Sequence, residues 1–111
     1  MTPAPTLWSR VCDYDALVPD RPAAALLATG QLAIVRLADG AVHAVANLDP
    51  FSGANVLARG LIGTRGMRSV IIGPMYKQAF DLVTGECLDD PAVRIAVYPV
   101  RVVDGGVEVA A

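Results

Sequence analysis

The feature that most constrains the fold is a tight turn between two apolar runs. Residues 31–37 (Gln-Leu-Ala-Ile-Val-Arg-Leu) and 41–46 (Ala-Val-His-Ala-Val-Ala) flank the segment Ala38-Asp39-Gly40. An Asp-Gly pair between two such runs is among the strongest short-range signals for a β-hairpin, because glycine accepts the positive φ that tight hairpin turns need. The sequence therefore predicts two antiparallel strands at residues 31–37 and 41–46.

Short apolar runs, each ended by a turn or a proline, cover most of the remaining chain. Residues 93–103 read as a strand with Pro99 inside it, which predicts a sheet edge or a bulge, because proline has no N–H to donate. Residues 13–19 read as a turn or one helical turn, and residues 47–60, rich in turn-forming residues, as a long loop. The other predicted strands or extended runs are residues 7–12, 23–28, 62–65, 68–72, 80–82, 87–88 and 107–109.

This pattern of short strands, with almost no helical period, predicts an all-β sandwich or small barrel of antiparallel strands. We expect residues 1–5 to form a flexible leader and residues 6–111 to form a single β domain. A chain of 111 residues buries roughly two-thirds of the surface that its unfolded form exposes. It should therefore fold without disulfides or metals.

Charge and hydropathy exclude several classes of partner. The net charge is −2, and Lys77 is the single lysine, with no basic run that would favour nucleic-acid binding. No apolar run approaches the roughly 18 residues of a membrane-spanning helix, so we expect no membrane partner. Residues 1–5 lack the basic and apolar regions of a signal peptide, so we expect a cytoplasmic chain.

The two cysteines and the single histidine lie within apolar runs. In a reducing compartment, Cys12 and Cys87 are expected to be free thiols that act as small buried hydrophobes. His43 lies in the middle of its run, where we expect a structural or surface role rather than a catalytic one.

Residues 73–91 predict a loop followed by a tight hairpin. Phe80-Asp81-Leu82 alternates apolar and polar residues, and Thr84-Gly85 is a turn signal. Cys87-Leu88 then predicts a return strand that Asp90-Pro91 ends.

This stretch resembles the second cluster-binding loop of Rieske-type iron–sulfur domains, which reads roughly C-P-x-H-G-x-x-F-D-x-x-T-G-x-C. The residues that agree with it in register are Pro74, Phe80, Asp81, Thr84, Gly85 and Cys87. The two iron ligands do not agree, since Gly73 stands at the cysteine position and Tyr76 at the histidine position. Lys77 replaces the glycine that follows.

The loop at residues 47–60 resembles the first cluster-binding loop, C-x-H-x-G-x-x-L. Asn47 falls at the cysteine position and Asp49 at the histidine position, while Gly53 and Leu57 match after a short insertion. A Rieske cluster needs two thiolates and two imidazoles. One histidine and two cysteines in the whole chain cannot supply these ligands, or those of a four-cysteine cluster. The sequence therefore predicts no cluster and no metal site.

Phe51, Met75 and Tyr76 are large apolar or aromatic residues in these two loops. They can fold inward and fill the space where a cluster would lie. Alternatively, they can form a docking surface, because aromatic residues and methionine are enriched in the cores of interfaces. The sequence leaves both interpretations open.

The whole chain, from about residue 8 to residue 109, resembles the small subunit of the cytoplasmic NAD(P)H-dependent assimilatory nitrite reductase. The strings that carry the resemblance are N-x-D-P-F-S-x-A-N-V-L at residues 47–57 and G-P-M-Y-K-Q-A-F-D-L at residues 73–82. The resemblance implies a Rieske-like fold and an accessory subunit without a cofactor or catalytic residue of its own. Its expected partner is a large subunit with FAD, sirohaem and an iron–sulfur cluster, which reduces nitrite to ammonium.

The resemblance further implies that the two former cluster loops bind the large subunit. The expected docking residues are Asn47, Asp49, Phe51, Met75, Tyr76 and Lys77. Two alternatives stay open: a genuine Rieske-type [2Fe-2S] electron carrier, and a scaffold or regulatory β module of another oxidoreductase complex.

Overall fold

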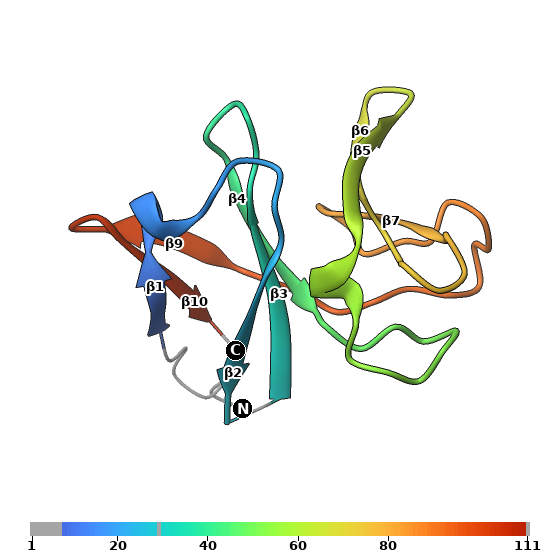
Figure 1. Ribbon diagram of the computed structural model, residues 1–111, viewed down its shortest axis with the longest axis horizontal. Helices are drawn as coiled ribbons and strands as arrows, with labels where there is room; N and C mark the ends of the chain where they lie inside the picture. The colour runs from blue at the N-terminus through green and yellow to red at the C-terminus, as the bar shows by residue number, and fades with distance from the viewer. Residues whose placement is uncertain (1–7, 29, 111) are drawn as a thin grey trace, which may run out of the picture.

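The computed structural model describes residues 8–28 and 30–110, which form three antiparallel sheets (Figure 1). The sheet orders are β1-β10-β9, β2-β3-β4-β8 and β5-β6-β7. The strands are β1 (Trp8–Asp13), β2 (Ala23–Leu27), β3 (Gly30–Arg36), β4 (Val42–Ala46), β5 (Leu61–Arg65), β6 (Arg68–Ile72), β7 (Ala79–Asp81), β8 (Val97–Tyr98), β9 (Val100–Val103) and β10 (Gly106–Ala110). Two short 3-10 helices, η1 (Tyr14–Ala16) and η2 (Leu57–Arg59), complete the described elements. In this part of the chain, no helix is long and apolar enough to span a membrane.

Strand β3 is buried on both faces because its sheet lies between the other two (Figure 1). Leu32 and Ile34 pack into one core with the residue that follows η1 and with residues of β10. Ala33 and Val35 pack into a second core with residues of β6, β7 and the loops around them. Side chains alternate between the faces of a strand, so the continuous apolar run of β3 supplies both cores.

The predicted hairpin is confirmed. Strands β3 and β4 pair antiparallel, with Val35 opposite His43. The Leu37 N–H donates to the Ala41 carbonyl (2.8 Å), and Gly40 takes a φ of 93° in the turn. The all-β prediction with short antiparallel strands is confirmed as well.

Three details differ from the prediction. Cys87 and Leu88 form no return strand; Cys87 makes only an isolated bridge to Phe80, because its N–H donates to the Val93 carbonyl. The strand predicted at residues 80–82 ends at Asp81, since Leu82 already lies in the turn. The strand predicted at residues 93–103 is two edge strands, β8 and β9, separated at Pro99. The predicted leader at residues 1–5 lies outside the described residues.

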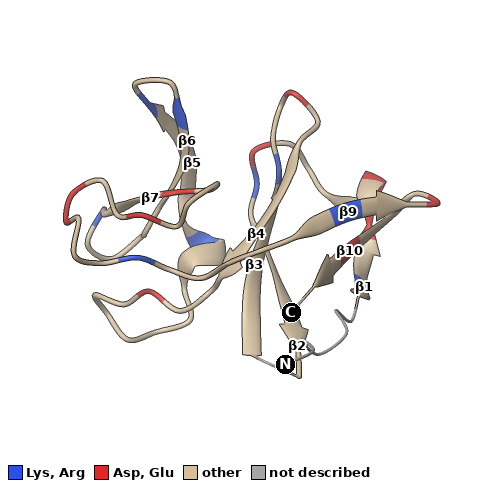
Figure 2. Ribbon diagram, turned by 180° about the vertical axis from the view of Figure 1, so that it is seen from behind, with Lys and Arg blue, Asp and Glu red and all other residues tan. Residues whose placement is uncertain are grey.

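Charged residues are spread over the three sheets and their loops (Figure 2). On the hairpin of β5 and β6, Arg65 pairs with Asp89 (2.7 Å) and Arg68 pairs with Asp81 (2.7 Å). The Arg65 guanidinium and the Ala79 N–H both bond to the Asp89 carboxylate and lower its pKa. These pairs tie the hairpin to the last residue of β7 and to the chain that follows it.

Gly85 closes the turn after β7 and is held tightly in place. Its φ is 79°, and its N–H donates to the Asp81 carbonyl while its own carbonyl accepts from the Ile95 N–H, both at 2.8 Å. A Cβ on Gly85 would lie 2.0 Å from the Ile95 carbonyl oxygen. No residue with a side chain fits this position without moving the backbone.

We expect Gly85→Ala to lower the free energy of unfolding by more than about 2 kcal/mol, because a backbone collision adds to the strain of positive φ. Gly66→Ala is the matched control, since Gly66 has a φ of 60° but no atom within 4 Å of an added Cβ. The control should lose about 1 kcal/mol. Urea unfolding of both variants measures the difference, and equal losses would contradict the role given to the Ile95 carbonyl.

Candidate functional site

The two loops that resemble cluster-binding loops meet in space. The first follows β4 and runs into η2, and the second, residues 73–78, joins β6 to β7. A Cβ on Gly73 would lie 3.2 Å from the Asp49 carboxylate and 3.6 Å from Leu57. Asp49 and Gly73 are therefore the point at which the loops touch. Both loops lie on the side of the molecule away from the β1-β10-β9 sheet (Figure 1).

Asn47 organises the first loop from the inside. Its side-chain oxygen accepts a hydrogen bond from the Ala58 N–H (2.7 Å). Its amide donates to the Gln31 side chain (3.1 Å) and to the Asn55 carbonyl (3.2 Å). The residue is 2% exposed, so these bonds replace water for a buried polar group. One side chain thus joins the start of the loop to β3 and η2.

Asp49 and Phe51 fill the interior of the same loop. The Phe51 N–H donates to the Asp49 carboxylate (2.9 Å), and the Gly53 N–H donates to the Asp49 carbonyl (2.8 Å). Asp49 is 1% exposed. The Phe51 ring packs against Phe80, with ring centroids 6.1 Å apart. Asp49 is therefore buried, and Phe51 packs against the core while part of it stays exposed.

The second loop presents its tip to solvent. Met75 and Tyr76 are 57% and 58% exposed, and Lys77 is exposed as well. Lys77 has a φ of 60°, in the left-handed region that favours glycine, and its N–H donates to the Gly73 carbonyl (3.1 Å). In this chain a lysine therefore adopts the left-handed conformation at the position where the Rieske pattern has glycine.

The structure thus divides the six expected docking residues into two groups. Asn47 and Asp49 are buried and bonded within the first loop, and Phe51 packs on the core. Met75, Tyr76 and Lys77 lie outside on the second loop. We refer to these three exposed residues as the loop tip.

Asp81 is a site residue whose structural role the sequence interpretation missed. Its side chain accepts hydrogen bonds from the Val83 N–H (2.7 Å) and the Thr84 N–H (3.0 Å) and pairs with Arg68. An aspartate that accepts hydrogen bonds from the N–H groups two and three residues later is a known turn-forming arrangement. The Asp-x-x-Thr-Gly spacing was the signal that could have revealed it.

The residues at the four ligand positions do not fit a [2Fe-2S] cluster. Asn47, Asp49, Gly73 and Tyr76 offer no thiolate and no imidazole, which are the ligands that a Rieske cluster needs. The Asp49 carboxylate already lies against Gly73. Among residues 8–28 and 30–110, no three His, Cys, Asp or Glu side chains gather in a way that could hold a metal ion.

The two cysteines lie at different cores. Cys87 is fully buried in the core between the β2-β3-β4-β8 and β5-β6-β7 sheets. Cys12 is half-buried against the opposite core, because the register of β1 shifts between Arg10 and Cys12. Burial, with Asp13 nearby, raises the pKa of the Cys12 thiol. The expectation of a buried cysteine is confirmed for Cys87 and holds only in part for Cys12.

Comparison with known proteins now identifies the family. A model of the Rieske-like [2Fe-2S] domain matches residues 7–110. The nitrite reductase (NADH) small subunit of Escherichia coli (strain K12) is 36% identical over 102 residues, covering 91% of this chain and 94% of that one. The chain belongs to the Rieske-like family of nitrite reductase small subunits.

Solved structures of this small-subunit family and of related ferredoxins have the same fold. A Mycobacterium tuberculosis crystal structure, described as a proposed NADH-dependent nitrite reductase small subunit, gives a TM-score of 0.93 at 50% identity and covers 96% of both chains. The ferredoxin of carbazole 1,9a-dioxygenase from Nocardioides aromaticivorans gives a TM-score of 0.82 at 28% identity, covering 95% of this chain and 98% of that one.

One relative of the small-subunit family is much longer. The nitrite reductase [NAD(P)H] large subunit of Klebsiella oxytoca is 39% identical over 100 residues, which cover 90% of this chain. The matched segment covers 10% of that protein, so this chain spans about a tenth of its length.

We expect Asn47→Ala to lower the free energy of unfolding by about 2–3 kcal/mol, because the Ala58 N–H and the Asn55 carbonyl lose their buried partner. Asn55→Ala is the matched control in the same loop: its side chain is exposed, so its removal should change stability by less than about 0.5 kcal/mol. Chemical denaturation of both variants tests this. A neutral Asn47→Ala variant would show that the buried amide does not hold the loop.

Proposed function

We propose that this chain is the accessory, non-redox small subunit of a cytoplasmic NAD(P)H-dependent nitrite reductase, and that it acts by binding the large subunit. The observation that carries the proposal is the match over 94% of the Escherichia coli small subunit. The four positions that would hold a cluster carry Asn47, Asp49, Gly73 and Tyr76, which gives this chain no electron-carrying group of its own.

The Klebsiella oxytoca relative supports the choice of partner. There, a segment similar to nearly all of this chain is part of the same polypeptide as a nitrite reductase large subunit. When two proteins are joined in one polypeptide in one organism and are separate in another, the separate proteins are natural candidates for a complex. In this proposal, the large subunit reduces nitrite to ammonium and carries FAD, sirohaem and an iron–sulfur cluster.

The proposed contact is the loop tip, formed by Met75, Tyr76 and Lys77. Exposed apolar and aromatic side chains on a loop are typical of interface cores, where tyrosine often contributes much of the binding energy. Behind the tip, Asn47 and Asp49 hold the first loop against Gly73 and thereby support the second loop. Phe51 contributes to the core, so its replacement should reduce stability as well as assembly.

We expect Tyr76→Ala to weaken binding to the purified large subunit by about tenfold or more, because it removes an aromatic anchor. The midpoint of thermal unfolding should stay unchanged, since the Tyr76 side chain is exposed in the free chain. Met67→Ala, at the fully exposed tip of the β5-β6 hairpin, is the control and should bind normally. Unchanged affinity of Tyr76→Ala would remove the loop tip from the interface, and failure of the unaltered chain to bind would refute the proposed function.

The likeness to the Nocardioides ferredoxin favours a second candidate, a Rieske-type electron carrier. Freshly purified protein, prepared without oxygen, decides between the candidates by iron and acid-labile sulfide analysis. We expect no stoichiometric iron or sulfide, because a cluster of this type needs thiolate and imidazole ligands. Two irons and two sulfides per chain would support the electron carrier instead.

A further inference from the structure

Most of the cations of this chain already have a partner within it. The sequence contains nine Lys and Arg residues. Arg36 lies over the Tyr14 ring, with its Cζ atom 4.1 Å from the ring centroid. Five others form ion pairs with Asp or Glu side chains: Arg10, Arg65, Arg68, Arg94 and Arg101. Within residues 8–28 and 30–110, Arg21, Arg59 and Lys77 have neither kind of partner.

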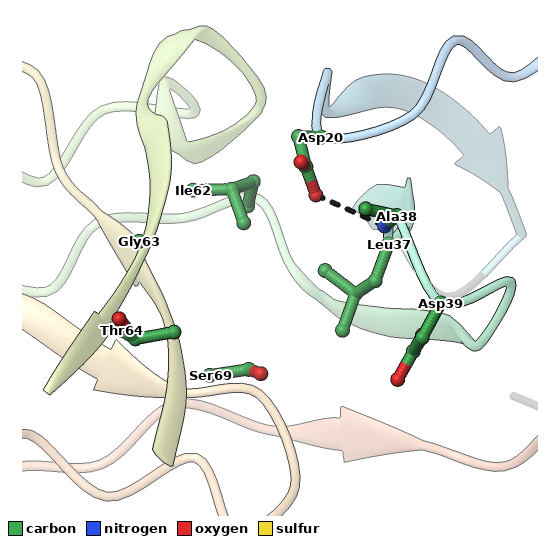
Figure 3. A pocket seen from close by; sticks show the side chains of 8 residues that line it. All are labelled: Asp20, Leu37, Ala38, Asp39, Ile62, Gly63, Thr64 and Ser69. Carbon is green, nitrogen blue, oxygen red and sulfur yellow. Dashed lines mark hydrogen bonds between the residues drawn. The ribbon is translucent and has the colours of Figure 1, made fainter. Parts of the chain in front are cut away.

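Of these three residues, Arg21 lies in acidic surroundings. It follows Asp20 directly in the sequence. Asp20 and Asp39 both line a hollow of about 310 Å³ between the turn of the β3-β4 hairpin and the β5-β6 hairpin (Figure 3). Arg21 therefore has an acidic residue beside it in the chain, and a second acid lines the same hollow.

Arg59 and Lys77, in contrast, belong to segments that expose no acid. Between residues 47 and 61 the charged residues are Asp49 and Arg59, and between residues 72 and 78 Lys77 is the single charged residue. Asp49 is 1% exposed, whereas Arg59 and Lys77 are both exposed. The exposed charges of these two segments are therefore both positive, in a chain whose net charge is −2.

The backbone contact of Gly60 places Arg59 next to the second loop. A Cβ on Gly60 would lie 2.0 Å from the Ile72 carbonyl oxygen, so the end of η2 packs directly on the residue before Gly73. The Lys77 N–H donates to the Gly73 carbonyl (3.1 Å), which brings the other end of the loop back to the same place. The two cations are thus attached to neighbouring backbone segments.

Large apolar side chains accompany these cations. Leu61 pairs with Ile72 across β5 and β6 and is 67% exposed. Met75 and Tyr76 are also more than half exposed. We refer to the exposed residues of this region as the loop face: Arg59, Leu61, Met75, Tyr76 and Lys77. Methionine, tyrosine and arginine are enriched at protein interfaces, and a small anion bound to the cations would leave the apolar groups in water. The loop face therefore favours a protein partner over a small anion.

We infer that the loop face binds an acidic patch on the nitrite reductase large subunit, where Arg59 and Lys77 lie opposite carboxylates of that subunit. The inference rests on the proposed function and adds Arg59, Leu61 and the charge of the partner surface to it. Cations without an internal partner can pair across an interface without first breaking an ion pair. Complementary charges of this kind speed association and fix the orientation of the partners. The net charge of −2 opposes long-range attraction to a polyanion such as nucleic acid.

The first test compares Arg59→Glu with Arg21→Glu in binding to the purified large-subunit holoenzyme. Both arginines are exposed, and both substitutions change the net charge by the same amount. We expect Arg59→Glu to weaken binding by about tenfold or more, because it places an acid opposite an acid. Arg21→Glu should change the affinity by less than about twofold, since salt screens distant charges. Thermal unfolding of both variants checks that the fold is intact.

The second test uses Lys77, which is the single lysine of the chain. A carbodiimide joins a lysine amine to a carboxylate that touches it, and the product is an amide. Mass spectrometry of the treated complex should identify Lys77 joined to an Asp or Glu residue of the large subunit. Lys77→Arg is the control: it keeps the positive charge and should bind normally, but it cannot form this amide.

The outcomes separate this inference from the proposed function. Normal binding of Arg59→Glu, equal weakening by Arg21→Glu, or a cross-linked complex in which Lys77 is unmodified would overturn the inference and leave the proposed function intact. The cross-link is made with the unaltered chain, so it tests the inference even where Arg59→Glu destabilises the fold. If the unaltered chain does not bind the large subunit at all, the proposed function fails, and the acidic patch inferred here fails with it.

Discussion

The structure depends on the contact between the two loops that resemble the cluster-binding loops of Rieske-type domains. Asp49 of the first loop lies against Gly73 of the second loop. Three hydrogen bonds of the Asn47 side chain hold the first loop in this position. The space is small enough that a side chain at Gly73 would crowd the carboxylate. Hydrogen bonds thus hold the first loop in shape, and its Asp49 carboxylate lies against Gly73 of the second loop. The fold is kept while the four positions of the cluster ligands carry Asn47, Asp49, Gly73 and Tyr76, which illustrates that function belongs to the site rather than to the fold.

The sequence predicts those parts of the molecule that local chemistry decides. The β3-β4 hairpin follows from Asp39-Gly40 and its apolar flanks, and the turn at Thr84-Gly85 follows from residues that favour it. The expectation that the chain holds no Rieske cluster rests on counting ligands, since the sequence has one histidine and two cysteines. Each of these features needs only a few neighbouring residues or a total composition, so no tertiary information is required.

Other features depend on partners that are distant in the sequence. The burial of Asn47 is possible only because the Ala58 N–H of η2 and the Gln31 side chain of β3 are brought to it. A polar residue in a loop is usually exposed, so its role inside the loop could not be read from its type. The same holds for Phe51 and Tyr76: both are aromatic loop residues, but only Phe51 lies beside Phe80. The division of residues 93–103 between two sheets likewise depends on β10, which comes later in the chain.

That division has a consequence for how the molecule opens. The segment from Val97 to Val103 gives an edge strand to the β2-β3-β4-β8 sheet and then one to the β1-β10-β9 sheet. Neither edge strand, β8 or β9, can move far from its sheet without displacing the other. Pro99 alone separates the two strands, and its ring limits the rotation of the backbone. Local fluctuations of the two sheets are therefore mechanically coupled. Thermal motion in this small domain should be shared between these two sheets, so that they lose their protection together rather than one after the other.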